Sequence, residues 1–384
     1  MKVEKNHLTP EKHYAIESSE LKDSADLVFY FSHRETLQNH SIYSALKKTY
    51  PNSILMGCST GGEIAQDDVH ENTAVSLAIQ FEKTTLKKAF IKINNNSDFF
   101  EAGQNLALQL KDATLKGVFV LSDGLSVNGS ELVNGLKSTL EDIPIMGGLA
   151  ADGSQFQQTL VGIDAEPTEK SIAAIGFYGD AIRFAWGSEG GWEPFGRERI
   201  VTKSHGNILY ELDGQPALTI YKSYLGKFAN ELPSSALLFP LRIHPPSDPK
   251  AFLVRTILGV NEEDQSMTFA GDIPEGYSAQ LMSGTAKNLT DGAELSAEAI
   301  KKNLPHAHLK SNSVAIIISC IGRKLMMGPR SIDEIEAVST ILNDPNFYRA
   351  GFFSYGEISP HTYSGIPELH NQTVTIAAFT EDLS

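Results

Sequence analysis

The sequence predicts an α/β fold made of repeated strand-helix-strand-strand units, which form two interlocked halves with a strand-rich insertion around residues 230–284. Three observations predict this class. The same order of apolar runs occurs three times, a helical stretch separates the first two runs each time, and each second run ends in a turn of small residues. The runs are short and almost continuously apolar, which suits strands that are covered on both faces.

Each repeat reads strand, helix, strand, small-residue turn and strand. The first, second and third repeats consist of the runs 25–32, 53–64 and 73–81; 116–124, 143–153 and 171–179; and 313–320, 350–358 and 372–379. The step from Val28 to Gly57 and the step from Val118 to Gly147 are both 29 positions. Equal spacing of equivalent residues indicates that one structural unit has been duplicated.

The linking helices carry start signals and apolar faces. Ser32 with Glu35, and Ser331 with Glu334, have the spacing of capping boxes. Ser130 predicts the N-cap of the helix in the second repeat. Residues at helical spacing then form apolar faces in the second and third repeats: Val133, Leu136 and Leu140, and Ile335, Val338, Ile341 and Leu342.

The stretch between the second and third repeats has a different pattern. Residues 251–284 read as short strands separated by turn formers, and residues 191–218 read as a loop, a hairpin and a helix that starts near Pro216. We therefore expect two domains, 20–213 and 214–384, with a hinge in the passage 213–230.

Composition and charge narrow the function classes. The formal net charge of −15 argues against nucleic acid as the main partner, because phosphate binding needs clustered Lys and Arg. No secretory signal is visible in the first twenty residues, and no apolar run approaches the roughly 20 residues of a membrane span. The two cysteines cannot form a disulfide framework. We expect a soluble, cytoplasmic protein without membrane insertion.

The segment Gly57-Cys58-Ser59-Thr60-Gly61 fits the G-x-S-x-G nucleophile elbow. That motif needs a helix directly after the serine, whereas the residues that follow here lead into another strand. Phe353 occupies the position of Ser59 in the third repeat. The sequence therefore disfavours a serine hydrolase, and it contains neither of the two common phosphate-binding glycine motifs.

Both cysteines stand at predicted strand ends, so each is either a nucleophile or a small buried residue. A reactive thiolate needs an electropositive setting, and Arg323 is the nearest cation to Cys320 in the sequence. The only close histidine pair, His306 and His308, flanks Pro305 in a polar loop without a second ligand cluster. We expect a protein that is not an enzyme, with a cysteine-dependent enzyme as an alternative.

The small-residue turns at 57–64, 147–153 and 351–358 predict a shared binding site. Glycines at strand ends let the backbone approach a ligand, and ligands of α/β sheets favour the carboxyl ends of strands. The expected ligand-binding residues are Cys58, Ser59, Thr60, Glu63, Gly148, Asp152, Cys320, Arg323, Tyr355 and Glu357. A structural alternative is that the glycines only let strands cross closely, while Glu63 and Glu357 cap backbone amides.

Several motifs together resemble the FIST family, in which a FIST N-terminal domain and a FIST C-terminal domain follow one another. The matching pieces, which cover about residues 25–380, are "GCSTGGEI", "LSDGLSVNG", "IMGGLAADGSQFQQTLVG", "LYELDGQPAL", "FAGDIPEG", Cys320-x-x-Arg323, "GFFSYGEI" and "HNQTVTI". The resemblance implies a stand-alone sensory protein that binds a small ligand, such as an amino acid or a derivative, and signals through a partner such as a histidine kinase.

The resemblance also leaves the cofactor open, because some stand-alone members are haem proteins that sense nitric oxide. Haem needs an apolar slot and usually a His, Cys, Met or Tyr ligand. The histidine candidates are His205, His244, His361 and His370, of which His205 and His370 rank first. Covalent c-type attachment is excluded, since no C-x-x-C-H is present.

Overall fold

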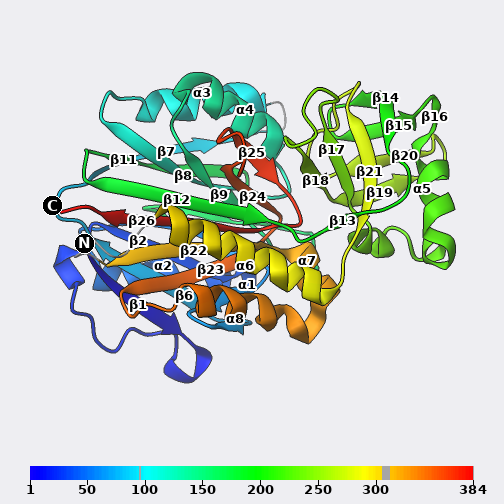
Figure 1. The fold of residues 1–384 in the computed structure, drawn as a ribbon. Helices are drawn as coiled ribbons and strands as arrows, with labels where there is room; N and C mark the ends of the chain where they lie inside the picture. Colours follow the sequence, from blue (N-terminus) through cyan, green and yellow to red (C-terminus); the bar gives the residue numbers. More distant parts are fainter. Residues whose placement is uncertain (95–96, 305–311, 384) are drawn as a thin grey trace.

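A computed structural model describes residues 1–94, 97–304 and 312–383, and it shows a large body with a smaller lobe at one end (Figure 1). In this part of the chain, strands form three sheets in the body and one in the lobe. Helices and strands are mixed throughout, which confirms the predicted α/β class. None of the helices among the described residues is long and apolar enough to cross a bilayer.

Each repeat supplies the centre of one body sheet, and the three centres have the same topology. The first strand of a repeat pairs parallel with the second strand and antiparallel with the third. These strands are β2 (Leu27–His33), β3 (Ile54–Thr60) and β6 (Ala74–Gln80); β8 (Leu115–Ser122), β9 (Ile145–Leu149) and β11 (Ser171–Tyr178); and β22 (Ser313–Cys320), β23 (Phe347–Ser354) and β26 (Val374–Glu381). The three predicted repeats are therefore real structural units.

An antiparallel strand flanks the third strand of every repeat. These flanking strands are β1 (Lys2–Leu8), β7 (Thr85–Lys92) and β12 (Ile182–Glu189). The opposite edge of each sheet is completed by another repeat. The first repeat sends β4 (Glu63–Ala65) to β23, the third sends β24 (Gly356–Pro360) to β9, and the second sends β10 (Val161–Ile163) to β3. The exchange is cyclic, and β5 (Asp68–His70) and β25 (Pro367–His370) extend two of the edges.

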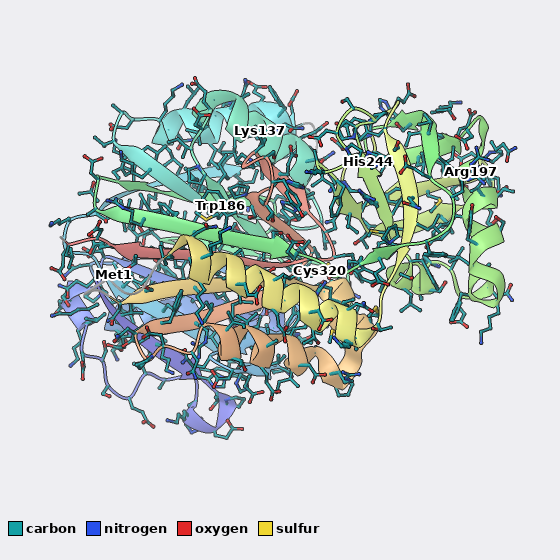
Figure 2. All side chains as sticks on the ribbon, viewed as in Figure 1. Met1, Lys137, Trp186, Arg197, His244 and Cys320 are labelled. Carbon is teal, nitrogen blue, oxygen red and sulfur yellow. The ribbon has the colours of Figure 1, made fainter. Side chains whose placement is uncertain are left out.

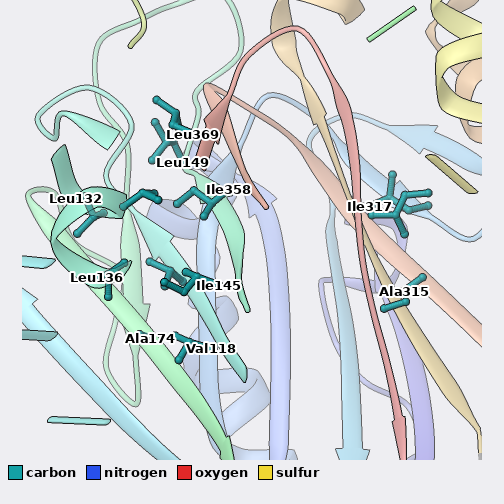
Figure 3. Close-up of a cluster of buried hydrophobic side chains, with 14 of the residues drawn as sticks. Val118, Leu132, Leu136, Ile145, Leu149, Ala174, Ala315, Ile317, Ile358 and Leu369 are labelled. Carbon is teal, nitrogen blue, oxygen red and sulfur yellow. The ribbon is translucent and has the colours of Figure 1, made fainter. Parts of the chain in front are cut away.

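Helices cover the outer faces of the three sheets. The first sheet is covered by α1 (Arg34–Asn39) and α2 (Ile42–Thr49), the second by α3 (Phe99–Leu110) and α4 (Gly129–Leu140), and the third by α6 (Ala286–Asn303) and α8 (Ile332–Ile341). The short helix α7 (Ile321–Met327) begins directly after β22. Figure 3 shows Leu132 and Leu136 of α4 packed over Val118 and Ile145.

The inner faces of the three sheets share one apolar core. Phe29 and Phe31 of the first sheet, Phe119 of the second, and Ile318 and Phe352 of the third belong to it, all at most 1% exposed. Alternate residues of the same strands point outward to the helices. Burial on both faces explains why the strands read as continuous apolar runs rather than as alternations.

The smaller lobe is inserted between β12 and α6. Its strands are β13 (Glu193–Pro194), β14 (Arg199–His205), β15 (Ile208–Leu212), β16 (Gln215–Pro216), β17 (Leu241–His244), β18 (Leu253–Arg255), β19 (Ile257–Asn261), β20 (Ser266–Phe269) and β21 (Ser278–Ser283). The helix α5 (Ala217–Leu225) and the 3-10 turns η3 (Gly226–Glu231) and η4 (Ser234–Leu238) pack on this sheet. Within residues 1–94, 97–304 and 312–383, the body also contains the 3-10 turns η1 (Pro10–Lys12), η2 (Lys22–Ser24) and η6 (Gly328–Ser331).

The insertion is longer than the 230–284 expected from the sequence, because β13 to β16 already belong to the lobe sheet. The expected hinge at 213–230 lies inside the lobe, within β16, α5 and η3. The chain instead enters and leaves the lobe at paired positions, where Glu193 and Pro194 lie opposite Ser283 and Met282.

Three predicted side-chain caps are absent, although α8 does begin directly after Ser331. The hydroxyl of Ser32 donates to the carbonyl of Thr73 at 2.6 Å, and α1 begins without a side-chain cap. Ser331 has helical backbone angles and makes no cap bond. Asn128, not Ser130, caps α4 through Oδ1, which accepts the backbone N–H groups of Ser130 and Glu131. The predicted apolar faces of α4 and α8 are confirmed by burial.

Equivalent glycines lie at the same place in each repeat, where the second strand passes the first. Gly57, Gly147 and Gly351 are the direct parallel partners of Tyr30, Val120 and Ile317. A Cβ atom at these glycines would lie 2.4, 1.8 and 1.8 Å from the carbonyl oxygens of the partner residues. The repeated glycines therefore allow a close backbone approach that no side chain permits.

This contact predicts that Gly351→Ala loses about 1–3 kcal/mol of unfolding free energy, because overpacking forces the two strands apart. Gly259→Ala is the control, since a Cβ there meets nothing within 4 Å and the backbone is not left-handed. The unfolding free energy of Gly259→Ala should stay within about 0.5 kcal/mol of the parent value or rise slightly. Chemical denaturation measures both, and equal effects would contradict the assignment.

Candidate functional site

The three small-residue turns meet at the carboxyl ends of the repeat strands. The N–H of Ala151 donates to the carbonyl of Ser59 at 3.0 Å, and the N–H of Gly61 donates to the carbonyl of Phe353 at 2.8 Å. The N–H of Tyr355 donates to the carbonyl of Leu149 at 3.2 Å. Turns that lie far apart in the sequence are thus joined by backbone hydrogen bonds.

Glu63 occupies the centre of the first turn and is fully buried. Its Oε1 accepts the hydroxyl of Thr60 at 2.5 Å, and its Oε2 accepts the N–H and the hydroxyl of Thr73 at 3.1 and 2.9 Å. These bonds tie the end of β3 to the start of β6. Both oxygens of the carboxylate therefore accept hydrogen bonds from residues of the first repeat.

Glu357 does the same in the third turn. Its Oε1 accepts the hydroxyl of Ser354 at 2.6 Å, and its Oε2 accepts the N–H and the hydroxyl of Thr373 at 3.2 and 2.9 Å. Burial raises the pKa of the Glu357 carboxyl to about 8 and that of Glu63 to about 7. The two equivalent side chains match the structural alternative, in which they cap backbone amides.

Asp152 organises the second turn. Its carboxylate accepts the backbone N–H groups of residues 156, 157 and 158, each at 2.9 Å, and lies 3.5 Å from the guanidinium of Arg34. The hydroxyl of Tyr355 donates to the same carboxylate. The ring of Phe156 stacks on the ring of Tyr355 with centroids 4.8 Å apart. Asp152 thus holds the aromatic pair in place.

Arg323 is completely buried in the body. Its guanidinium pairs with Glu334 and donates to the carbonyls of Gln372 at 2.9 Å and Leu289 at 2.8 Å. These contacts join α7, α8, α6 and the turn before β26. The side chain is engaged with the protein and does not line the cavity between body and lobe, to which its neighbours Ile321 and Gly322 contribute.

Three further predicted residues also pack inside the body. Ser59 accepts the N–H of Leu160 through its hydroxyl at 2.9 Å. Cys58 belongs to the central apolar core. A Cβ at Gly148 would lie 2.9 Å from a side-chain carbon of Ile318, so the glycine serves close packing.

A cavity of about 480 Å³ opens between the body and the lobe. Of the predicted residues, Cys320, Tyr355 and His205 line it, and Figure 2 shows Cys320 at the end of the body that faces the lobe. The walls are mainly apolar and include Leu125, Val127, Leu149, Phe156, Phe269 and Ile321. Volume and lining match the usual form of a small-molecule site.

The polar groups of the cavity were missed in the sequence. Both parts of the molecule contribute: Ser126, Asn128 and Glu131 come from the body, and Asn207 and Thr256 come from the lobe. The hydroxyl of Thr256 is buried without a hydrogen-bond partner among the described residues. Burial raises the pKa of the Glu131 carboxyl. Ser126 and Asn128 belong to the motif "LSDGLSVNG", which was the sequence feature that could have pointed to these polar groups.

Both thiols are buried. Burial raises the pKa of Cys320 to about 12, with the nearby Glu357 as a second cause, and burial raises the pKa of Cys58 well above its usual value. A thiol with such a pKa stays protonated at neutral pH, whereas nucleophilic cysteines have lowered pKa values. The setting of Cys320 therefore does not favour cysteine catalysis.

The two favoured haem ligands lie in different places. His205 is exposed and lines the cavity between body and lobe. His370 is buried beside a separate cavity, its Nε2 lies 3.1 Å from the carbonyl oxygen of Ser359, and burial lowers its pKa to about 3. No metal-holding group of three or more His, Cys, Asp or Glu exists among the described residues. His306 and His308 lie outside them.

The raised pKa values of Glu63 and Glu357 predict a pH dependence of stability. The usual glutamate pKa of 4.5 applies to the unfolded chain, so the folded state binds more protons between pH 4.5 and about 8. Stability should fall as pH rises through this window, by at most about 1.4 kcal/mol per pH unit for each group.

Glu357→Gln mimics the protonated carboxyl, since its amide can donate to Ser354 and accept from Thr373. The unfolding free energy of Glu357→Gln minus that of the parent should therefore grow from pH 5 to pH 8.5. Glu336→Gln, an exposed side chain on α8, is the control and should not follow this curve. A flat difference for Glu357→Gln would contradict the raised pKa.

Two domain families match most of the chain. The FIST N domain matches residues 26–215, and the FIST C domain matches residues 217–360. An uncharacterized protein of Methanocaldococcus jannaschii is 26% identical over 358 residues, which are 85% of this chain and 65% of that protein. An uncharacterized protein of Mycobacterium tuberculosis is 23% identical over 360 residues, which are 91% of this chain and 90% of the relative.

A crystal structure of chorismatase aligns over 99% of this chain and 98% of its own, with 8% identity. Its TM-score of 0.35 is too low to carry an argument. The two domain matches are consecutive and leave only short flanks. The chain belongs to the FIST family, whose domains are sensory domains of small-ligand binding in signal transduction.

Proposed function

We propose that this protein binds a small ligand in the cavity between body and lobe and reports its presence to a partner such as a histidine kinase. One observation carries the proposal: the cavity of about 480 Å³ takes its walls from both parts of the molecule. The predicted turns support it indirectly, because Asp152 positions the Tyr355–Phe156 pair that forms one wall.

The lining suggests the chemistry of the ligand. Apolar walls favour a hydrophobic group, and the unpartnered hydroxyl of Thr256 favours a polar group beside it. Glu131 provides the carboxyl group of the cavity and would accept hydrogen bonds from an amine. A small amine with an apolar side group fits this combination, which agrees with the amino-acid-like ligands implied by the resemblance.

The insertion of the lobe suggests how binding is reported. The lobe is joined to the body through two neighbouring segments, and Glu193 and Ser283 pair where they meet. A ligand that contacts both walls favours the arrangement in which the walls are closest. Binding can shift an equilibrium only through different affinity for two arrangements, and a site shared by two parts provides such a difference.

Filling the cavity tests the proposal. Ala270 lines it and is half-buried, so Ala270→Trp should occupy the space that a ligand needs. Native mass spectrometry of protein purified from its own host should show a retained small molecule in the parent. We expect the molecule to be lost from Ala270→Trp.

The matched control is Ala165→Trp, which adds the same side chain at an exposed position outside the cavity lining. This variant should retain the molecule at the parent level. Equal retention by Ala270→Trp and Ala165→Trp would place the ligand elsewhere.

Haem in the same cavity is the second candidate, favoured by the position of His205. An imidazole beside apolar walls suits a haem site, whereas the Cys320 thiol is held protonated. His205 would hold the iron, and bound haem would supply a site for a diatomic gas. His370 does not line this cavity, so the two histidines would not share one haem.

Titration with haemin tests this candidate by absorbance. If haem binds there, the parent should develop a Soret band and His205→Ala should lose or shift it. His13→Ala changes an exposed histidine outside the cavity and should behave as the parent does. A parent without a Soret band, or a band that His205→Ala leaves unchanged, would remove the haem candidate.

A further inference from the structure

Another cavity, of about 250 Å³, lies where the edge strand β1 meets the β4–β5 hairpin and β23. Four of its lining residues carry side-chain nitrogens that bind anions in proteins: Lys5, His7, His70 and Arg349. They come from three separate strands or hairpins, because β4 of the first repeat crosses to the sheet of the third repeat. None of them lines the cavity between body and lobe.

The geometry of the strands brings these side chains together. Lys5 and His7 are two residues apart on β1, so they point to the same face. The ring of His7 lies against the ring of His70, with centroids 4.1 Å apart. Arg349 is 7% exposed, and its Nη1 donates to the carbonyl of Leu342 at 2.8 Å, which fixes the guanidinium.

Several nitrogens of this group have no partner. Nε2 of His7 and Nε of Arg349 are buried without a hydrogen bond among the described residues. The ammonium of Lys5 makes no hydrogen bond or ion pair within residues 1–94, 97–304 and 312–383. Buried polar groups are nearly always paired, so the two buried nitrogens of His7 and Arg349 indicate a missing acceptor, and the exposed ammonium of Lys5 lies at the same cavity.

The charged residues around this cavity favour the binding of an anion. Asp67 pairs with Nη2 of Arg349 at 3.0 Å and is 65% exposed, and Asp68 lies 3.9 Å from His70 and is 58% exposed. These carboxylates and Glu11 stand on the solvent side, where water and salt screen them. Burial and, to a smaller extent, the nearby Arg349 lower the pKa of Lys5, while Asp67 raises it, so a second cation lies close to the Lys5 ammonium.

We propose that this cavity binds a tetrahedral oxyanion, such as the phosphate group of a small metabolite. A guanidinium and an ammonium with two imidazoles can donate to several oxygens at once, as phosphate binding requires. The site lies in the body on strands of the first and third repeats. It is independent of the ligand cavity proposed above, so either proposal can fail without the other.

Thermal unfolding in inorganic phosphate tests the site, with sodium chloride adjusted to keep the ionic strength constant. A ligand that binds only the folded state raises Tm with its concentration. The parent Tm should therefore rise with phosphate and with sulfate, and rise less with acetate, which is planar. Lys5→Gln and His7→Gln should each weaken the apparent affinity for phosphate about tenfold.

Lys2→Gln is the matched control, because Lys2 is exposed on the other face of β1. It should respond to phosphate as the parent does. Lys5 is exposed on an edge strand, so its variant should fold, and circular dichroism checks this. The proposal is overturned if phosphate does not raise the parent Tm, if Lys5→Gln responds like Lys2→Gln, or if acetate stabilises as well as phosphate.

Discussion

Backbone hydrogen bonding between repeats is the constraint on which the body depends. Each repeat builds three central strands but leaves one edge open, and an open edge exposes unpaired N–H and C=O groups. Strands β4, β24 and β10 close these edges in a cycle, so no repeat has a complete sheet by itself. The arrangement needs all three units, and it places their turns beside one another.

The polar residues at the turns hold this arrangement in place. Glu63 and Glu357 each bind the two strands that flank a turn, and Asp152 collects three backbone N–H groups. Arg323 joins helices and loops through carbonyls and Glu334. These groups are satisfied by the protein, and the cavity proposed for the ligand lies farther out, where Tyr355 of the third turn faces the lobe.

Much of the fold could be predicted, because local sequence patterns indicate the strands and the repeats. The apolar runs around Val28, Val118 and Ile316 are examples. The helix caps could not, because Ser32 finds its partner in Thr73, which is distant in sequence. The cavity could not be predicted for the same reason: Thr256 and Glu131 meet only after the lobe docks on the body. The charged residues beside glycines in the three turns indicated that the turns matter, but they did not show whether their role is structural or ligand binding.

The paired entry and exit of the lobe have an evolutionary consequence. A segment that leaves and rejoins a framework at adjacent points can be lengthened, shortened or exchanged while the framework keeps its connections. Here Glu193 and Ser283 mark these points, and the three sheets of the body contain no strand from the lobe. Selection can thus remodel one wall of the cavity while the inherited scaffold stays the same.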